Sequence, residues 1–143
     1  MPATQRHDPF SGGRFRVEID GIARSTFESI SGLAGFAEVE AYREGGDRVT
    51  RKEIGEVSYE NIRLRAGLDD DRELFDWWQT VVTGTPARKN MSVVLLSGSG
   101  QEVARWNVSE AVPVRYEVSG LHARESDVVC ELLEIAHEGI ARS

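Results

Sequence analysis

Histidine and its possible acidic partners are the residues of this chain whose types could support catalysis. The three histidines, His7, His122 and His137, are far apart, and neither an HxxxH nor a CxxC spacing occurs, so we predict no metal site. His137 and Glu138 could act as an acid–base pair, but a pair at the end of a strand, on a surface or an interface, is the favoured interpretation. No serine, histidine and aspartate set is indicated. The sequence therefore predicts no catalytic residue and no cofactor.

Three other motifs also have a structural interpretation. Asp69, Asp70 and Asp71 lack the spacing of a calcium loop, so we expect them to cap a helix. Cys130, the only cysteine, follows two valines and has no basic neighbour, which favours a buried small hydrophobe over a reactive thiolate. The glycine–serine–glycine run at 98–100 is too short to bind phosphate and predicts a hairpin turn.

Length and charge exclude further classes of function. The 143 residues suit one domain with a hydrophobic core. The net charge is −7, with 24 acidic and 17 basic residues, so sequence-specific nucleic-acid binding is not expected. The N-terminus has no apolar run typical of a signal peptide, and no apolar segment approaches the ~20 residues of a membrane span. We expect a chain made in the cytoplasm without a signal peptide or a membrane anchor.

Alternating apolar and polar residues predict about eight strands. They are expected at residues 14–19, 25–30, 36–42, 57–66, 91–97, 102–108, 112–118 and 127–136. Asp20 and Gly21 predict a hairpin turn between the first two. This pattern favours a mainly β barrel or sandwich.

One helix is predicted at about 70–83. Its apolar stripe has the spacing of a helix face that packs on a core, and it contains Leu74, Trp77, Trp78, Val81 and Val82. Trp77 and Trp78 could stack on a base or a sugar, but on this stripe at least one is expected to anchor the helix in the core. Gly84 and Pro86 end the helix.

Two segments fall outside the regular pattern. Residues 1–13 predict a flexible N-terminal arm, with residues 14–143 forming a single domain. Residues 42–57 predict an extended hairpin, because a glycine-punctuated and charged segment stands between two strands. That many charges fit an element that faces a partner.

The ordered set of these motifs resembles the tube proteins of phage tails and contractile injection systems over residues 8–140. The signature segments are Tyr42-Arg43-Glu44-Gly45-Gly46-Asp47 in the hairpin and Ala136-His137-Glu138-Gly139 near the C-terminus. The other matching segments are Asp8–Phe10, Phe15–Ile22, Phe27, Ser31–Leu33, Leu64, Gly67–Leu68, Leu74–Trp77, Arg88–Val93, Ala104–Val108, Ala111–Tyr116, Leu121 and Glu131–Ile135. Each segment is weak evidence by itself, and only their order is specific.

The resemblance implies two packed antiparallel sheets that form a β-barrel-like domain with one flanking α-helix. It implies a structural subunit, not an enzyme. Six copies would form a ring, and the rings would stack into a hollow inner tube inside a contractile sheath, with a baseplate and a tube-capping protein as partners and protein effectors as cargo. The particle, a component of a phage tail-like assembly, could be released from the cell.

The residues that the resemblance places at subunit or ring contacts lie in the hairpin and near the C-terminus. They are Tyr42, Arg43, Glu44, Gly45, Gly46, Asp47, Arg48, Arg51, Lys52, His137 and Glu138. Two alternatives stay open. One is the tail tube of a contractile-tailed phage that conducts DNA, and the other is a monomeric β-barrel ligand-binding module.

Overall fold

A computed structural model describes residues 8–123 and 128–143 of the chain. In chain order its elements are β1 (Phe15–Ile19), β2 (Ser29–Ser31), β3 (Gly35–Tyr42), β4 (Arg51–Tyr59), β5 (Ile62–Gly67), α1 (Glu73–Val82), β6 (Lys89–Leu96), β7 (Glu102–Ser119), β8 (Cys130–Ala136) and β9 (Gly139–Arg142). The fold is mainly β with one helix in the described residues, as predicted. Residues 8–13 are exposed and carry no helix or strand, while the rest of the predicted arm lies outside the described residues.

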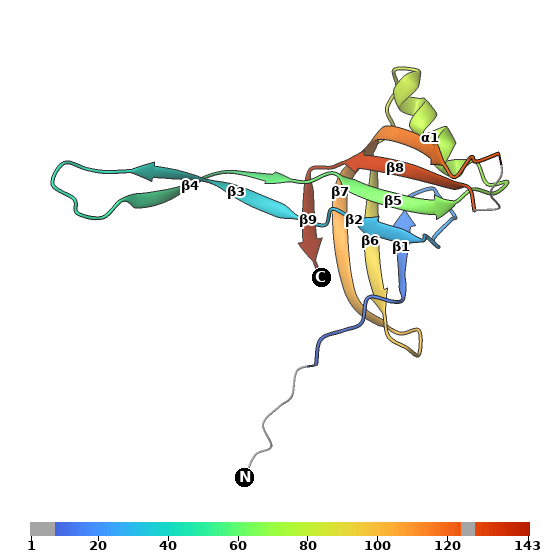
Figure 1. The fold of residues 1–143 in the computed structure, drawn as a ribbon, viewed down its shortest axis with the longest axis horizontal. Coiled ribbons are helices and arrows are strands. Elements are labelled where there is room, and N and C mark those ends of the chain that lie inside the picture. The colour runs from blue at the N-terminus through green and yellow to red at the C-terminus, as the bar shows by residue number, and fades with distance from the viewer. Residues whose placement is uncertain (1–7, 124–127) are drawn as a thin grey trace, which may run out of the picture.

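Two antiparallel sheets share the long strand β7 (Figure 1). The first half of β7 pairs with β6 on one side and with β9 on the other, and β6 pairs with β1. The second half of β7 pairs with β8, which leads to β5 and then to β2. Because β1 and β2 do not pair with each other, the body is two packed sheets and not a closed barrel.

The bend that takes β7 from one sheet to the other lies at Glu110. This residue has a φ of 53°, and the pairing with β6 shifts register beside it. The Asn90 side chain accepts the Glu110 N–H at 3.2 Å, and Arg88 donates to the Glu110 carbonyl at 3.3 Å. Two side chains thus satisfy backbone groups that the bend takes out of the ladder.

The core lies between the two sheets and under α1. Leu74 and Trp77 of the helix are buried, and Trp77 donates its indole N–H to the Ala87 carbonyl at 2.7 Å. The inward residues of the strands complete the core: Val17, Ile19, Ile62, Leu64, Met91, Val108, Leu133 and Ile135. Trp77 therefore anchors the helix, as expected, while Trp78 is partly buried against the core.

The helix is shorter than the predicted 70–83. The N-cap residue is Arg72, which makes no side-chain cap bond, so the three aspartates do not occupy the cap position that we expected. Asp71 accepts the Glu73 N–H of the first turn at 2.8 Å, and Asp69 accepts the Asp71 N–H at 2.9 Å before the helix begins. At the other end, Gly84 N donates to Val81 O and Thr85 N donates to Thr80 O. This pair of hydrogen bonds is the Schellman motif, which ends the helix before Pro86.

Four of the predicted strands were wrong in extent. The segment 25–30 forms only the short β2, which pairs with β5, and the turn at 20–21 closes one isolated bridge between Ile19 and Ile22. The strand predicted at 57–66 is broken at residues 60–61, between β4 and β5. The strands predicted at 102–108 and 112–118 are both part of β7, and β9 was not predicted.

The hairpin of β3 and β4 projects from the body (Figure 1). Its strands pair with each other and with no other strand of the described chain. Every residue of β3 is exposed. The hairpin is thus longer than the predicted 42–57, since ordered strands extend back to residue 35 and forward to residue 59.

Candidate functional site

The tip of the hairpin, residues 43–50, contains a four-residue turn from Glu44 to Asp47. Asp47 N donates to Glu44 O at 3.0 Å, and Gly46, in the third position, has a φ of 93°. A type II turn requires this left-handed conformation at its third position, where glycine has no steric penalty. The two-glycine signature in the sequence therefore shapes the end of the hairpin.

Asp47 also holds two arginines at the tip. Arg43 donates through Nη2 to the Asp47 carbonyl at 3.1 Å, and Arg51 donates through Nε to Asp47 Oδ2 at 3.2 Å. Three of the predicted contact residues thus bond one another within the subunit. Glu44, Arg48 and Lys52, at the tip or beside it, form no ion pair within the described residues and are exposed.

The root of the hairpin holds His137. Its Nε2 lies 3.0 Å from the Glu60 carbonyl, its Nδ1 accepts the Gly139 N–H at 3.2 Å, and its ring lies 5.5 Å from that of Tyr59. Because Nδ1 is an acceptor, this pattern assigns the neutral tautomer with the proton on Nε2. His137 therefore ties the β4–β5 connection to the β8–β9 turn.

The predicted contact residues form two groups. Nine lie at the tip or in the adjoining ends of β3 and β4, and Tyr42 among them is 38% exposed and pairs with Arg51. His137 and Glu138 lie at the root. Glu138 is exposed and donates its backbone N–H to Ser109 O.

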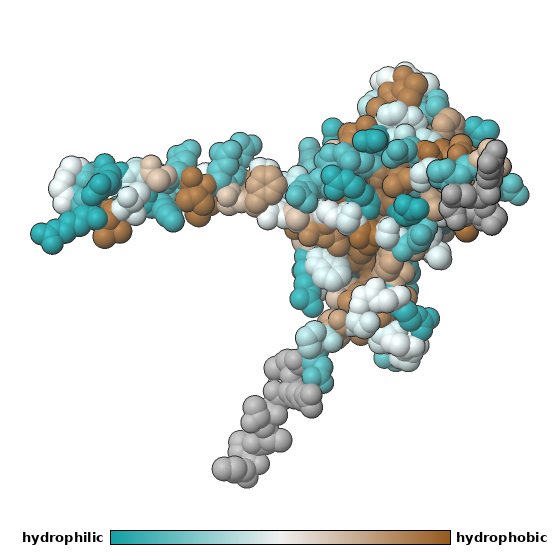
Figure 2. All heavy atoms as spheres, viewed as in Figure 1, coloured by the Kyte–Doolittle hydropathy of each residue, from teal (hydrophilic) through white to brown (hydrophobic). Residues whose placement is uncertain are grey.

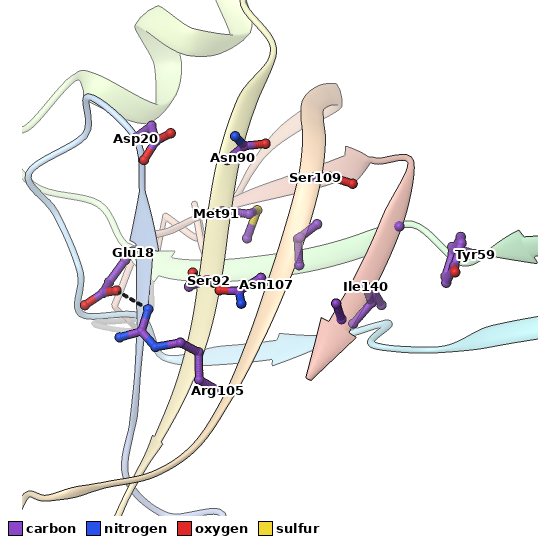
Figure 3. Close-up of a pocket in the computed structure, with 13 residues that line it drawn as sticks. Glu18, Asp20, Tyr59, Asn90, Met91, Ser92, Arg105, Asn107, Ser109 and Ile140 are labelled. Carbon is purple, nitrogen blue, oxygen red and sulfur yellow. Dashed lines mark hydrogen bonds and ion pairs between the residues drawn. The ribbon is translucent and has the colours of Figure 1, made fainter. Parts of the chain in front are cut away.

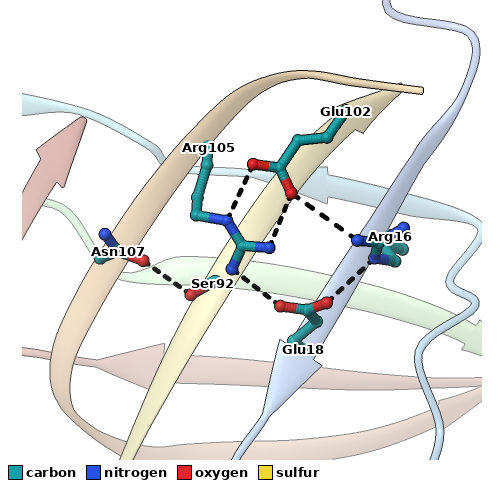
Figure 4. Close-up of polar contacts among 6 residues, drawn as sticks. All are labelled: Arg16, Glu18, Ser92, Glu102, Arg105 and Asn107. Carbon is teal, nitrogen blue, oxygen red and sulfur yellow. Dashed lines mark hydrogen bonds and ion pairs between the residues drawn. The ribbon is translucent and has the colours of Figure 1, made fainter. Parts of the chain in front are cut away.

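The outer face of the first sheet carries a closed network of four charges (Figure 4). Arg105 binds Glu102 at 2.7 Å and Glu18 at 2.8 Å, and Arg16 binds Glu18 at 3.0 Å and approaches Glu102 at 3.7 Å. The hydrogen bonds from Arg105 lower the pKa of both glutamates and raise the pKa of the guanidinium. Two positive and two negative side chains thus neutralise one another on this face.

Val94 lies beneath this network. It pairs with Arg16 on β1 and with Arg105 on β7, so the three residues form one row on the outer face. Val94 is nevertheless 0% exposed. We attribute the burial of Val94 to the alkyl stems of the two arginines, because long charged side chains often shield apolar neighbours from water.

A surface cavity of about 680 Å³ lies beside the network (Figure 3). Glu18 and Arg105 stand on one side of it, and Ile140 and Tyr59 on the other. Its other lining residues include Asp20, Asn90, Met91, Ser92, Asn107 and Ser109. Ser92 donates to Asn107 at 2.8 Å, so polar groups of the cavity are already bonded to each other.

A buried polar cluster was not predicted from the sequence. Glu131 is 3% exposed and accepts from Tyr116 Oη at 2.7 Å and from Arg24 Nη1 at 3.2 Å. Arg24 also donates to the Gly67 carbonyl. The only signal was an acidic residue at an inward position of a strand, which carries no information about a partner 107 positions away.

The remaining candidates for chemistry are metal ligands and the single cysteine. No group of histidine, cysteine, aspartate or glutamate side chains within them could hold a metal ion. Cys130 is buried and donates to Glu28 at 3.3 Å. Among the helices of that part of the chain, none is long and apolar enough to cross a membrane.

The chain belongs to the family of T4-like virus tail tube proteins (gp19), whose sequence profile matches residues 12–141. Its members are structural, and this chain is accordingly a tail tube protein, a structural subunit of an inner tube. Among proteins with curated functions, no sequence relative matches the chain.

Solved structures give the same classification. A chain in the baseplate of the anti-feeding prophage (AFP) is 26% identical, with a TM-score of 0.85 over 96% of this chain and 97% of that one. A chain in the sheath–tube complex of PVC, an extracellular contractile injection system, in its extended state is 25% identical, with a TM-score of 0.85 over 94% and 91%. Hcp1 from Flavobacterium johnsoniae, at 16% identity and a TM-score of 0.57 over 90% and 94%, shares the fold.

Proposed function

We propose that this tail tube protein forms rings of six copies that stack into the inner tube of a contractile injection system. The support is that the neighbours of at least 25% identity belong to the AFP and PVC particles, one of them within a sheath–tube complex. A surrounding sheath, a baseplate and a tube-capping protein are the partners that follow. The tube would be assembled in the producing cell and would carry protein effectors in its lumen.

The projecting hairpin is the observation that carries this proposal. The strands β3 and β4, of eight and nine residues, pair with each other and with no other strand of the described chain, and they extend away from the body. A two-stranded hairpin is marginally stable by itself in water. A contact between this element and a different surface of the next copy is heterologous, and repetition of such a contact builds rings or open filaments.

A passive role fits the surface chemistry. The charges on the outer face of the first sheet are neutralised within the subunit, and two pairs of side chains that line the cavity, Glu18 with Arg105 and Ser92 with Asn107, bond each other. We therefore propose a subunit that does no catalysis and needs no cofactor or metal. The net charge of −7 per copy, repeated around a ring, would disfavour adhesion of acidic cargo.

Size-exclusion chromatography and negative-stain microscopy of the purified chain test the assembly. Rings or tubes with a central hole are expected. A discrete monomer at every concentration, with a small ligand in the cavity, would instead support the binding-module alternative.

The phage alternative has one observation in its favour, because the matching family profile is that of a viral tail tube. The contents of particles isolated from the source cells distinguish a phage tail from an injection system. Nuclease-protected DNA in the particles would establish a phage tail, whereas protein cargo without DNA supports an injection system.

The contact residues are proposed at the tip of the hairpin. Replacing both Arg43 and Glu44 by alanine is expected to leave the subunit folded and to abolish tube growth, since both lie far from the core. Arg63→Ala, which removes another exposed arginine, from a strand of the body, is the matched control. Normal tubes from the double variant would refute the assignment of these residues.

A further inference from the structure

The projecting hairpin has two chemically different faces. Residues directly opposite each other on paired strands share a face, and Ala37 pairs with Val57, Val39 with Ile54, and Ala41 with Lys52. Five of these six side chains are apolar. The hairpin therefore has an apolar face, made of Ala37, Val39, Ala41, Ile54 and Val57.

This apolar face is uncovered in the single subunit. Val39 is 57% exposed, Val57 is 56% exposed and Ile54 is 70% exposed. Figure 2 shows hydrophobic side chains along the hairpin, well away from the body. Scattered single apolar residues are ordinary on a protein surface, but a contiguous row on a projecting element marks a contact site.

The opposite face is acidic in its middle. Glu38, Glu40 and Glu53 lie there, and Glu40 stands directly opposite Glu53 in the register. Like charges in that position repel each other. Within the described residues none of the three forms an ion pair, and Gly55 leaves room beside Glu38 and Glu40 for their side chains. The middle of this face is therefore suited to water, while Phe36 lies at its end nearest the body.

Charge decides which face can meet another subunit. Each copy carries a net charge of −7, so a neighbouring copy repels the acidic face on average. The apolar face has no such penalty and gains from burial. A tube protein also supplies many further copies of the same chain, which makes a second copy the occupant that the family assignment provides.

We infer that the hairpin docks on a second copy of this chain through its apolar face and leaves its acidic face in solvent. The inference rests on the proposed function and adds to it the side of the hairpin that forms the contact. It also shifts the main contact from the charged tip to the strands. The charges at the tip then set specificity around an apolar centre.

Two neighbouring positions on opposite faces test this orientation. Val39→Cys and Glu40→Cys are each made in a Cys130→Ala background, so that each protein has one thiol, and alkylation is followed before and after assembly. Because the reaction requires access to the thiolate, assembly is expected to slow it about tenfold or more at position 39 and less than about twofold at position 40. Equal protection, or greater protection at position 40, would overturn the inference.

A second pair of variants measures the consequence for assembly. Replacing Val39 and Ile54 together by threonine keeps β-branched residues in the strands but adds a hydroxyl to each. Tube yield is expected to fall at least about tenfold, with an unchanged circular dichroism spectrum, because neither side chain is in the core. Glu40→Gln with Glu53→Gln, on the opposite face, is the control and is expected to assemble normally.

The outcomes distinguish a failure of the proposed tube assembly from a failure of the inferred apolar contact. Parental protein that forms no ring or tube at any concentration would overturn the tube assembly and the inference together. Tubes that form equally well from the parent and from the threonine variant would overturn only the inference.

Discussion

Tyr116 donates its phenolic hydroxyl to the buried carboxylate of Glu131 at 2.7 Å and so joins β7 to β8. Arg24 approaches the other carboxylate oxygen at 3.2 Å, from the loop that follows β1. The carboxylate is 3% exposed, and a charge with so little contact with water is tolerated only when it is paired and hydrogen-bonded. The cluster therefore ties the loop after β1 to the second sheet.

Replacing Arg24 by an uncharged residue should destabilise the subunit strongly. Arg24→Met leaves Glu131 buried without its partner and is expected to cost about 3 kcal/mol in the free energy of unfolding. Adding Glu131→Gln to that variant removes the charge itself and should recover roughly half of the loss. Denaturant unfolding of the two single variants and the double variant measures this coupling, and strictly additive losses would contradict it.

The hydrogen bond between Tyr116 and Glu131 should also affect the titration of Tyr116 at high pH. Burial, together with the hydrogen bond to Glu131, raises the pKa of Tyr116 from 10.0 to about 12. Since the folded-state pKa lies above the unfolded value, this contact stabilises the fold fully below pH 10.0 and loses its effect as the pH rises towards about 12. Tyrosinate absorbance should show one tyrosine titrating later than the others, and Tyr116→Phe should remove that step. Tyr42→Phe, in the hairpin, should leave it unchanged.

The fold class and the single helix could be predicted from sequence because both depend on local periodicity. The bend in β7 could not. Ser109 and Glu110 interrupt the alternation, which suggests two strands, whereas the chain continues through the bend because Asn90 and Arg88 satisfy the Glu110 backbone. The four residues of β9 are too few for a periodic signal and form a strand only against β7.

The candidate site also has parts that could be predicted from sequence and parts that could not. The tip of the hairpin could be predicted, since Gly45 and Gly46 specify a turn between two alternating segments. The contact of Glu18 with Arg105 could not, because it joins residues 87 positions apart through the register of three strands. The resemblance to tube proteins named His137 as a contact residue, but its place at the root of the hairpin is a property of the folded chain.

The charge network on the first sheet should respond to the loss of one arginine. Arg105→Gln removes the main cause that lowers the pKa of Glu18 and of Glu102, so both values should rise towards those of ordinary glutamates. A carboxyl with a lowered folded-state pKa stabilises the fold above its ordinary pKa and loses that effect as the pH falls through the lowered value. The variant should therefore lose less stability on acidification than the parent.

Carboxyl chemical shifts in NMR titrations measure these changes directly. Arg63→Gln is the control, because Arg63 pairs with Glu134 on the other sheet and should leave Glu18 and Glu102 unaffected. Unchanged titration of both glutamates in the Arg105→Gln variant would contradict the described network.

Gly32 should not tolerate any side chain. Its φ is 92°, and an added Cβ would lie 2.1 Å from the Asn61 carbonyl oxygen, which is backbone and cannot move aside cheaply. Gly32→Ala is expected to cost roughly 3 kcal/mol or more, from the clash and the left-handed backbone together. Gly84 has a similar φ of 85° with open space around it, so Gly84→Ala should cost only about 1 kcal/mol. Equal losses in thermal or denaturant unfolding would show that the clash is relieved.

His137 should control how firmly the hairpin is held at its root. His137→Phe keeps an aromatic ring beside Tyr59 but removes the bonds to Glu60 and Gly139, so the amide of Gly139 should exchange faster with solvent while the core amides stay protected. Hydrogen exchange of the Gly139 amide, compared with that of the core amides, measures this effect. Glu138→Gln is the control, and equal protection of Gly139 in all three proteins would show that the ring does not hold the root.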